Sequence, residues 1–121
     1  MYPDRFKGRT AIVTGAASGL GKAAAARIVA EGGQVVLWDL NAEALETAKA
    51  ETGAVGVVAL DVSDLVAVSA AAKASKEILG KIDILINSAG ITGATVPVWE
   101  FPVESWLKVM DINLNGLFYC C

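Results

Sequence analysis

The stretch "TAIVTGAASGLGKAAAARIVAEGG", residues 10–33, decides the fold of this 121-residue chain. Its first part, Thr10–Gly15, is apolar and rich in β-branched residues, which predicts a short buried strand. Its second part, Gly19–Glu31, is rich in alanine and carries apolar residues four apart, which predicts a helix. The apolar face expected for that helix consists of Leu20, Ala24 and Ile28.

Three glycines lie where the strand gives way to the helix: Gly15, Gly19 and Gly21. Glycine is a poor helix former, so its presence at a helix start suggests a steric requirement. A diphosphate binds to bare N–H groups at the positive end of a helix. Side chains here would obstruct the turn, the ligand, or the packing of the helix on the sheet. The glycines therefore predict a phosphate site, to which Ser18 adds a hydroxyl donor. The alternative is a tight glycine-rich turn that binds nothing.

The remainder of the chain repeats the alternation of strand and helix. Three more strands are expected at Val35–Asp39, Ala54–Val62 and Ile82–Gly90. Helices are expected from an Asn41 cap to near Gly53, from Ser63 or Asp64 to Gly80, and over residues 103–121. This alternation predicts an α/β fold in one domain over residues 1–121: a Rossmann-type parallel sheet, strand order 3-2-1-4, with helices on both faces.

Composition and charge exclude several classes of partner. Apolar residues make up 55% of the chain, enough for a sizeable core, and the net charge of -3 offers no basic surface for nucleic acid. No apolar run is long enough to span a membrane, and the polar N-terminus lacks a signal peptide, so a soluble, cytoplasmic protein is expected. The chain has no histidine, and its only cysteines are the adjacent Cys120 and Cys121. This predicts no metal site, no disulfide framework and buried thiols.

A carboxylate closes the second expected strand. Asp39 follows Gly21 by 18 residues, at the edge of the sheet where parallel α/β folds bind their ligands. At this position a carboxylate can accept hydrogen bonds from the two ribose hydroxyls of an adenosine, and it would repel a 2′-phosphate. No arginine stands beside Asp39 or in the glycine turn. NAD is therefore expected in preference to NADP, and an ordinary turn aspartate is the alternative.

Four motifs, in order along the chain, resemble those of the short-chain dehydrogenases/reductases. The first, "TGAASGLG" (Thr14–Gly21), is similar to the cofactor signature Thr-Gly-x3-Gly-x-Gly of that family. The second, "LDV" (Leu60–Val62), resembles the segment after the family's third strand. This resemblance implies that Asp61 bonds the adenine amino group and that Val62 lies beside the ring.

The other two motifs follow the fourth strand. "NSAG" (Asn87–Gly90) resembles Asn-Asn-Ala-Gly, which implies that Asn87 stabilises the sheet and that Ala89 and Gly90 let the cofactor backbone pass closely. Ser88 departs from the family's second asparagine, but it keeps a donor and an acceptor, so binding is expected to survive. "INLNG" (Ile112–Gly116) resembles the helix motif with the family's active-site asparagine, here Asn113.

Residues and motifs together predict the cofactor site: Gly15, Ser18, Gly19, Leu20, Gly21, Asp39, Leu40, Asp61, Val62, Asn87, Ala89 and Gly90. Asn113 is the one catalytic residue implied, holding a water; a helix residue bonded to nearby backbone is the alternative. In the family a serine and a Tyr-x3-Lys complete the site, and neither tyrosine here, Tyr2 or Tyr119, has that spacing. The resemblance therefore implies the N-terminal, cofactor-binding half of a longer enzyme, inactive by itself.

The function implied is hydride transfer between NAD and a small-molecule secondary alcohol or ketone, in a protein expected to form homo-oligomers. The substrate stays open among sugars, sugar acids, acyl ketones and steroids. The segment Ile91–Pro102 carries Trp99 and Phe101, which either border the substrate pocket or anchor the core.

Two other functions compete with this one. The chain could be a non-catalytic dinucleotide-binding or self-assembling module, with apolar surface at Met110, Leu114, Leu117 and Phe118. It could also be a methyltransferase with a similar sheet, which fits Asp39 but not the spacing of the three glycines.

Overall fold

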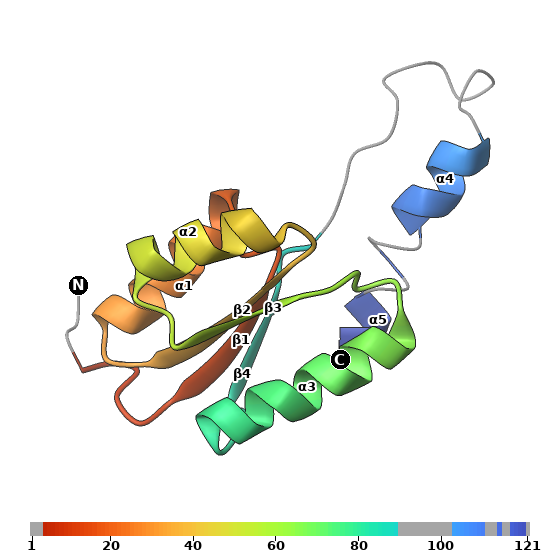
Figure 1. Cartoon of the computed structure of the whole chain (residues 1–121). Coiled ribbons are helices and arrows are strands. Elements are labelled where there is room, and N and C mark those ends of the chain that lie inside the picture. Colours follow the sequence, from red (N-terminus) through yellow and green to blue (C-terminus); the bar gives the residue numbers. More distant parts are fainter. Residues whose placement is uncertain (1–3, 90–102, 111–113, 115–116, 121) are drawn as a thin grey trace.

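A computed structural model describes residues 4–89, 103–110, 114 and 117–120 (Figure 1). Within these residues, strands and helices alternate as β1 (Thr10–Thr14), α1 (Gly19–Ala30), β2 (Gln34–Asp39), α2 (Ala42–Thr52), β3 (Gly56–Ala59), α3 (Leu65–Leu79) and β4 (Ile84–Asn87). The helices α4 (Val103–Met110) and α5 (Leu117–Cys120) follow. The expected alternation of strand and helix is confirmed.

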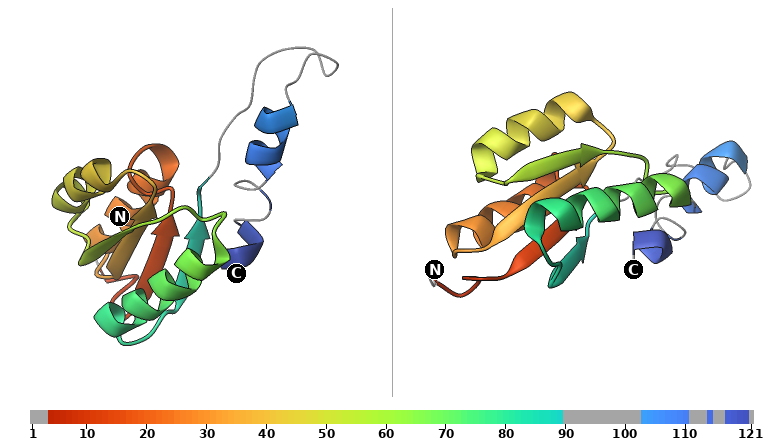
Figure 2. Two further views of the ribbon diagram at one scale, coloured as in Figure 1. Left: turned by 45° about the vertical axis from the view of Figure 1, so that its right-hand side comes forward. Right: turned by 60° about the horizontal axis from the view of Figure 1, so that its bottom comes forward.

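The strands form one parallel sheet in the order β3-β2-β1-β4, as predicted. β1 lies inside the sheet, with Ile12 opposite Val36 of β2 and opposite Leu85 of β4. α1 and α2 cover one face, and α3 with the short α5 lies on the other (Figures 1 and 2). The strand order reverses between β1 and β4, which places α3 on the opposite face and leaves a crevice at the carboxyl ends of these two strands.

Alternate strand residues point to opposite faces and build two apolar clusters, one under α1 and α2 and the other under α3. Leu37 and Trp38, adjacent in β2, are buried in one cluster each. The Trp38 indole N–H donates to Ser75 Oγ of α3 at 2.9 Å, so the polar atom of the ring has a partner inside the core. Cys120 packs against the α3 cluster but is only half-buried, contrary to the prediction; Cys121 lies outside the described residues.

The buried face of α1 differs from the predicted one. Leu20 is 86% exposed, and the buried residues are Gly21, Ala25 and Ile28. The cause lies in the preceding turn, because a Cβ on Gly21 would stand 2.5 Å from the carbonyl oxygen of Gly15. The helix therefore begins with glycine turned toward the sheet, and Leu20 is turned outward.

Three elements are shorter than the sequence predicts. β3 and β4 occupy only the middle of the predicted Ala54–Val62 and Ile82–Gly90. A strand extends only as far as its neighbour pairs with it, and the register of β2 with β3 ends at Asp39 opposite Ala59. Within residues 103–121, expected to be helical, α4 and α5 are separate helices, and between them only Leu114 is described.

The helix caps follow their sequence signals. Asn41 Oδ1 accepts from the Ala44 N–H at 3.0 Å, which caps α2, and Gly53 ends that helix in the left-handed conformation. Of the two residues proposed to open α3, Asp64 is the cap, since its side chain accepts from two backbone N–H groups in the first turn. These caps are local features, so the sequence alone could place them.

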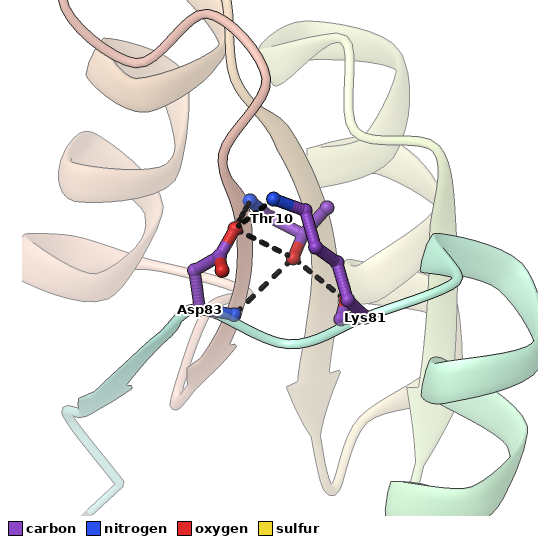
Figure 3. Close-up of polar contacts among 3 residues, drawn as sticks. All are labelled: Thr10, Lys81 and Asp83. Atoms are coloured by element: carbon purple, nitrogen blue, oxygen red, sulfur yellow. Dashed lines mark hydrogen bonds and ion pairs between the residues drawn. The ribbon is translucent and has the colours of Figure 1, made fainter.

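At the amino edge of the sheet, Thr10 and Asp83 fasten β1 to β4 (Figure 3). Asp83 Oδ2 accepts from the Thr10 N–H at 3.1 Å, and the Asp83 N–H donates to Thr10 Oγ1 at 3.2 Å. The Thr10 hydroxyl donates to the Lys81 carbonyl at 2.6 Å, and Lys81 Nζ lies 3.1 Å from Asp83 Oδ2. These contacts set the register of β4 where the strand begins.

Acid is expected to weaken the contacts of Asp83 with Thr10 and Lys81. The Lys81 side chain, followed by the Thr10 N–H, holds the pKa of the Asp83 carboxyl below its ordinary value of 3.8. Because the folded state prefers the carboxylate, the stabilisation is present above the ordinary pKa and is lost as pH falls through the lowered one. When the pH is lowered from about 5 to about 2, the melting temperature of Asp83→Asn should therefore fall less than that of the unmodified chain. Thermal unfolding followed by circular dichroism measures both. The control is Asp64→Asn, a matched change at an exposed cap, and an unchanged acid response in Asp83→Asn would refute this role.

Candidate functional site

A cleft of about 500 Å³ opens at the carboxyl edge of the sheet. Its lining comes from the turn between β1 and α1 and from the segments that follow β2, β3 and β4: Gly15, Ser18, Gly19, Leu20, Asp39, Leu40, Leu60, Asp61, Val62, Ser88 and Ala89. This is the edge at which parallel α/β sheets bind ligands, next to the point where the strand order reverses. The volume suits an organic ligand of moderate size.

The three glycines of the β1–α1 turn have three different functions. Gly15 has a φ of +63°, and a Cβ there would lie 2.5 Å from the Ser88 carbonyl oxygen, so this glycine lets the end of β4 approach the turn. Gly21 lets α1 approach the Gly15 carbonyl oxygen closely, because a Cβ at position 21 would stand 2.5 Å from that oxygen. Gly19 has a φ of +61°, and a Cβ there would meet no described atom within 4 Å. Its missing side chain therefore leaves open space at the cleft.

The start of α1 forms part of the lining of the cleft. Ser18 is the N-cap residue, its backbone is extended, and its side chain makes no capping hydrogen bond. Ser18, Gly19 and Leu20 all line the cleft. The N–H groups in the first turn of a helix have no partner within the helix and carry partial positive charge, which favours an anion such as phosphate.

Asp39 lies in the cleft and is held by backbone on two sides. Its Oδ2 accepts from the Ala17 N–H of the glycine turn at 3.0 Å. Its Oδ1 accepts from the N–H groups of Leu40 at 2.7 Å and Asn41 at 3.3 Å. The carboxylate therefore joins the glycine turn to the end of β2.

Asp61 and Val62 line the cleft after β3. The Ser63 hydroxyl donates to Asp61 Oδ1 at 2.6 Å, and the Ser63 N–H donates to the same oxygen at 2.9 Å. These bonds, the hydroxyl first, hold the pKa of the Asp61 carboxyl below its ordinary value of 3.8, so the group is charged at neutral pH. A carboxylate beside the apolar Val62 offers what a heteroaromatic amine needs: a hydrogen-bond acceptor and an apolar wall.

Thr14, buried at the end of β1, holds the segment that follows β4. Its Oγ1 accepts from the N–H groups of Ser88 at 3.0 Å and Ala89 at 3.2 Å, and its hydroxyl lies 3.5 Å from the Ile86 carbonyl. Asn87 lies opposite Thr14 in the sheet. One threonine hydroxyl therefore binds two N–H groups of the segment that forms this wall of the cleft.

The structure brings most of the predicted cofactor-binding residues together around the cleft: Gly15, Ser18, Gly19, Leu20, Asp39, Leu40, Asp61, Val62 and Ala89. Gly21 and Asn87 are not among the residues that line the cleft: Gly21 lies where α1 contacts the Gly15 carbonyl, and Asn87 is the last residue of β4. Gly90, Asn113 and the segment Ile91–Pro102 lie outside the described residues. That these residues bind a cofactor stays a prediction.

Leu60 and Ser88 line the cleft, although neither was among the predicted site residues. Leu60 directly precedes Asp61, and Ser88 stands between Asn87 and Ala89. A position just beyond the carboxyl end of a parallel strand is the signal that could have identified both.

The charged groups of the cleft are both acidic. Among the described residues that line it, Asp39 and Asp61 carry charge, and there is no lysine or arginine.

The described part of the chain contains no group of three or more histidine, cysteine or acidic side chains that could hold a metal ion. None of the helices described is long and apolar enough to cross a membrane.

Known proteins resemble this chain over almost its whole length. Residues 9–121 match the family model of the short chain dehydrogenases. The chain is 69% identical over 120 residues to 2-dehydro-3-deoxy-L-rhamnonate dehydrogenase (NAD(+)) of Sphingomonas sp. (strain SKA58), which covers 99% of this chain and 48% of that protein. It is 41% identical over 124 residues to D-threitol dehydrogenase of Mycolicibacterium smegmatis, covering 99% of this chain and 47% of that protein.

Among solved structures, NAD+-bound xylitol dehydrogenase is similar to this chain with a TM-score of 0.91 and 38% identity, over 96% of this chain and 46% of that one. The chain spans about half the length of the curated relatives it matches. The parallel sheet, the glycine-rich turn after β1 and the match to the family model all indicate the same family. This chain therefore belongs to the short-chain dehydrogenase family.

Proposed function

We propose that this chain is the cofactor-binding part of an NAD-dependent oxidoreductase that transfers hydride between a nicotinamide and a secondary alcohol or ketone. The observation that carries the proposal is one cleft in which the start of α1 and the Asp39 carboxylate meet. An anion site next to an acceptor for hydroxyl groups suits an adenosine diphosphate. The name of the relative that is 69% identical includes NAD(+), which supports the choice of cofactor.

The residues of the cleft fit such a dinucleotide. Gly19 leaves open space beside the start of α1, where a diphosphate can reach the N–H groups, and Ser18 offers a hydroxyl. Asp39 offers an acceptor for the adenosine ribose, and Asp61 with Val62 offers an acceptor and a wall for the adenine. When bound, NAD supplies the nicotinamide that takes up or gives the hydride. The residues of this chain bind the cofactor and orient it.

Proton transfer to or from the substrate needs a group that this sequence lacks. The family resemblance assigns that step to the tyrosine of a Tyr-x3-Lys, and the tyrosines here are Tyr2 and Tyr119 without such a lysine. A tyrosine with an unperturbed pKa of about 10 needs a positioned cation to act near neutral pH. We therefore propose that the 121 residues bind NAD without turnover, and that Asn113 holds a water in the complete site.

The names of three similar proteins support the choice of substrate class; they include a deoxy sugar acid, threitol and xylitol. Each offers a secondary alcohol or ketone beside further hydroxyl groups. We propose a sugar acid or polyol of this kind.

Titration of the purified chain with NAD and with NADP tests the proposal. The cleft lining carries two carboxylates and, among its described residues, no cation, so the 2′-phosphate of NADP meets repulsion at Asp39. NAD should bind at least about tenfold more tightly than NADP in calorimetry, a difference of about 1.4 kcal/mol. Tighter binding of NADP would overturn the cofactor assignment, and binding of neither would overturn the proposed function.

A non-catalytic, self-assembling module is the second candidate, and the apolar surface of the last helices favours it. Val103 and Leu107 of α4 are 66% and 58% exposed, and Leu114 is 53% exposed. Met110 is half-buried, and the side chains of Leu117 and Phe118 are not among those described. A homo-oligomer would cover such a surface. Light scattering at several chain concentrations, together with calorimetric titration with NAD, separates the two candidates: association without NAD binding supports the module, and NAD binding by a chain that stays monomeric supports the first candidate.

A further inference from the structure

We propose that the hydrogen bond between Trp38 of β2 and Ser75 of α3 sets the position of α3 along the sheet, and through α3 the position of the cleft wall at Asp61 and Val62. Neither Trp38 nor Ser75 lines the cleft, so both are positioning residues. The ligand in this inference rests on the proposed function, whereas the position of α3 rests on the contacts of the chain itself.

The bond between Trp38 and Ser75 is buried and directional. Trp38 is 2% exposed, Ser75 is 0% exposed, and the indole N–H donates to Ser75 Oγ at 2.9 Å. An indole N–H can only donate, and in the core it has no water to replace a lost acceptor. The position of α3 that brings Ser75 Oγ within hydrogen-bonding distance of the indole is therefore favoured over positions that separate them.

The rest of the buried face of α3 gives little directional preference. Every residue of this helix is described, and its buried residues are Val68, Ala71, Ser75 and Leu79, of which only Ser75 is polar. Apolar contacts depend mainly on the area that they bury, so they tolerate small shifts of a helix along its axis. One buried polar contact can select a single register among such alternatives, as a buried asparagine does in a coiled coil.

A short turn joins the start of α3 to the wall of the cleft. The Asp64 N–H donates to the Asp61 carbonyl at 3.0 Å, and the Asp64 side chain caps α3. Val62, inside this turn, lines the cleft and belongs to the same apolar cluster as Trp38. A short hydrogen-bonded turn absorbs little displacement of the helix that follows it. A shift of α3 therefore moves Asp61 and Val62, the wall proposed for the adenine.

Hydrogen exchange in the chain without ligand, measured by nuclear magnetic resonance, tests the position of α3. Ser75→Ala removes the acceptor, so the Trp38 indole N–H should exchange about tenfold faster. The displaced helix should also weaken the bond from Asp64 to Asp61, so the Asp64 amide should exchange at least about fivefold faster. Unchanged exchange of Asp64 in Ser75→Ala would overturn the proposed role.

Thr52→Val is the matched control for Ser75→Ala. It also removes a buried hydroxyl, but the bonds of that hydroxyl lie within α2 and the turn after it, on the other face of the sheet. The exchange of the Trp38 indole and of the Asp64 amide should therefore stay as in the unmodified chain. Equal acceleration of Asp64 in both variants would mean that general loss of stability is the cause, and would overturn the proposal.

Calorimetry with NAD and with nicotinamide hypoxanthine dinucleotide tests the effect on the cleft. The hypoxanthine analogue lacks the adenine amino group, so the preference for NAD over this analogue measures the contact with Asp61. In Ser75→Ala the preference should fall about fivefold, whereas Thr52→Val should keep it. A merely structural role of Ser75 would leave the preference unchanged, and that result would overturn the proposal.

Trp38→Phe and the double variant with Ser75→Ala test whether the bond itself is the cause. Phenylalanine removes the donor, and the freed Ser75 hydroxyl can bond to a carbonyl of its own helix. Because both residues act through one bond, the double variant should lose no more of the preference than Trp38→Phe alone. Additive losses would overturn the proposal. If the unmodified chain binds no NAD, or binds both dinucleotides equally, the proposed cofactor contacts fail, and the exchange of Asp64 still decides the role of the bond.

Discussion

Gly15→Ala is expected to destabilise the chain by about 3 kcal/mol and to abolish binding of NAD. Gly15 has a φ of +63°, and a Cβ on it would stand 2.5 Å from the Ser88 carbonyl oxygen and 2.8 Å from the Ala89 nitrogen. Both contacts are with backbone, which cannot turn away as a flexible side chain can. The turn and the end of β4 must separate, and these two segments form adjacent walls of the cleft. Denaturant unfolding and calorimetric titration with NAD measure the two effects.

Gly8→Ala is the matched control for this substitution. Gly8 also has a positive φ, +77°, but a Cβ there would meet no described atom within 4 Å. Gly8→Ala should therefore lower the free energy of unfolding only by the cost of placing alanine in the left-handed conformation, about 1 kcal/mol. Its NAD binding should be unaffected. If the two variants lose the same stability, the close approach of β4 is not what requires glycine at position 15.

Thr14→Val is expected to cost about 2 kcal/mol of stability and to weaken NAD binding at least about tenfold. Valine has nearly the shape of threonine, so packing at this buried site is kept while the hydroxyl is lost. The N–H groups of Ser88 and Ala89 then lose the acceptor that they share, at 3.0 and 3.2 Å. Without it, the segment that follows β4 is free to move away from the cleft.

Thr10→Val separates stability from binding. Thr10 lies in the same strand, but its hydroxyl contacts Lys81 and Asp83 at the amino edge of the sheet, away from the cleft (Figure 3). This variant should lose stability in denaturant unfolding and keep the NAD affinity of the unmodified chain. Equal loss of affinity in both variants would mean that Thr14 acts through overall stability and not through the position of Ser88 and Ala89.

Much of the fold could be predicted because its signals are local. The Asn41 cap, the Gly53 stop and the alternation of β-branched runs with alanine-rich segments each depend on a few consecutive residues. The face of α1 could not be predicted this way. Leu20 follows the apolar spacing, yet the contact of Gly21 with the Gly15 carbonyl turns it outward.

Part of the candidate site could likewise be predicted from the sequence, and part required the tertiary structure. From the sequence alone came the residue types that a dinucleotide needs, the glycines before α1 and Asp39 after β2, because each ends or begins a recognisable element. Only the tertiary structure decided which glycine serves the turn, which serves the packing of α1 and which leaves open space at the cleft, and which N–H groups bind the Asp39 carboxylate. Those assignments depend on distances between segments far apart in the chain, such as the 2.5 Å that a Cβ on Gly15 would have to Ser88. A sequence pattern states which residues can meet at the edge of a sheet, and the packing of β4 and α1 against one turn determines how closely they do.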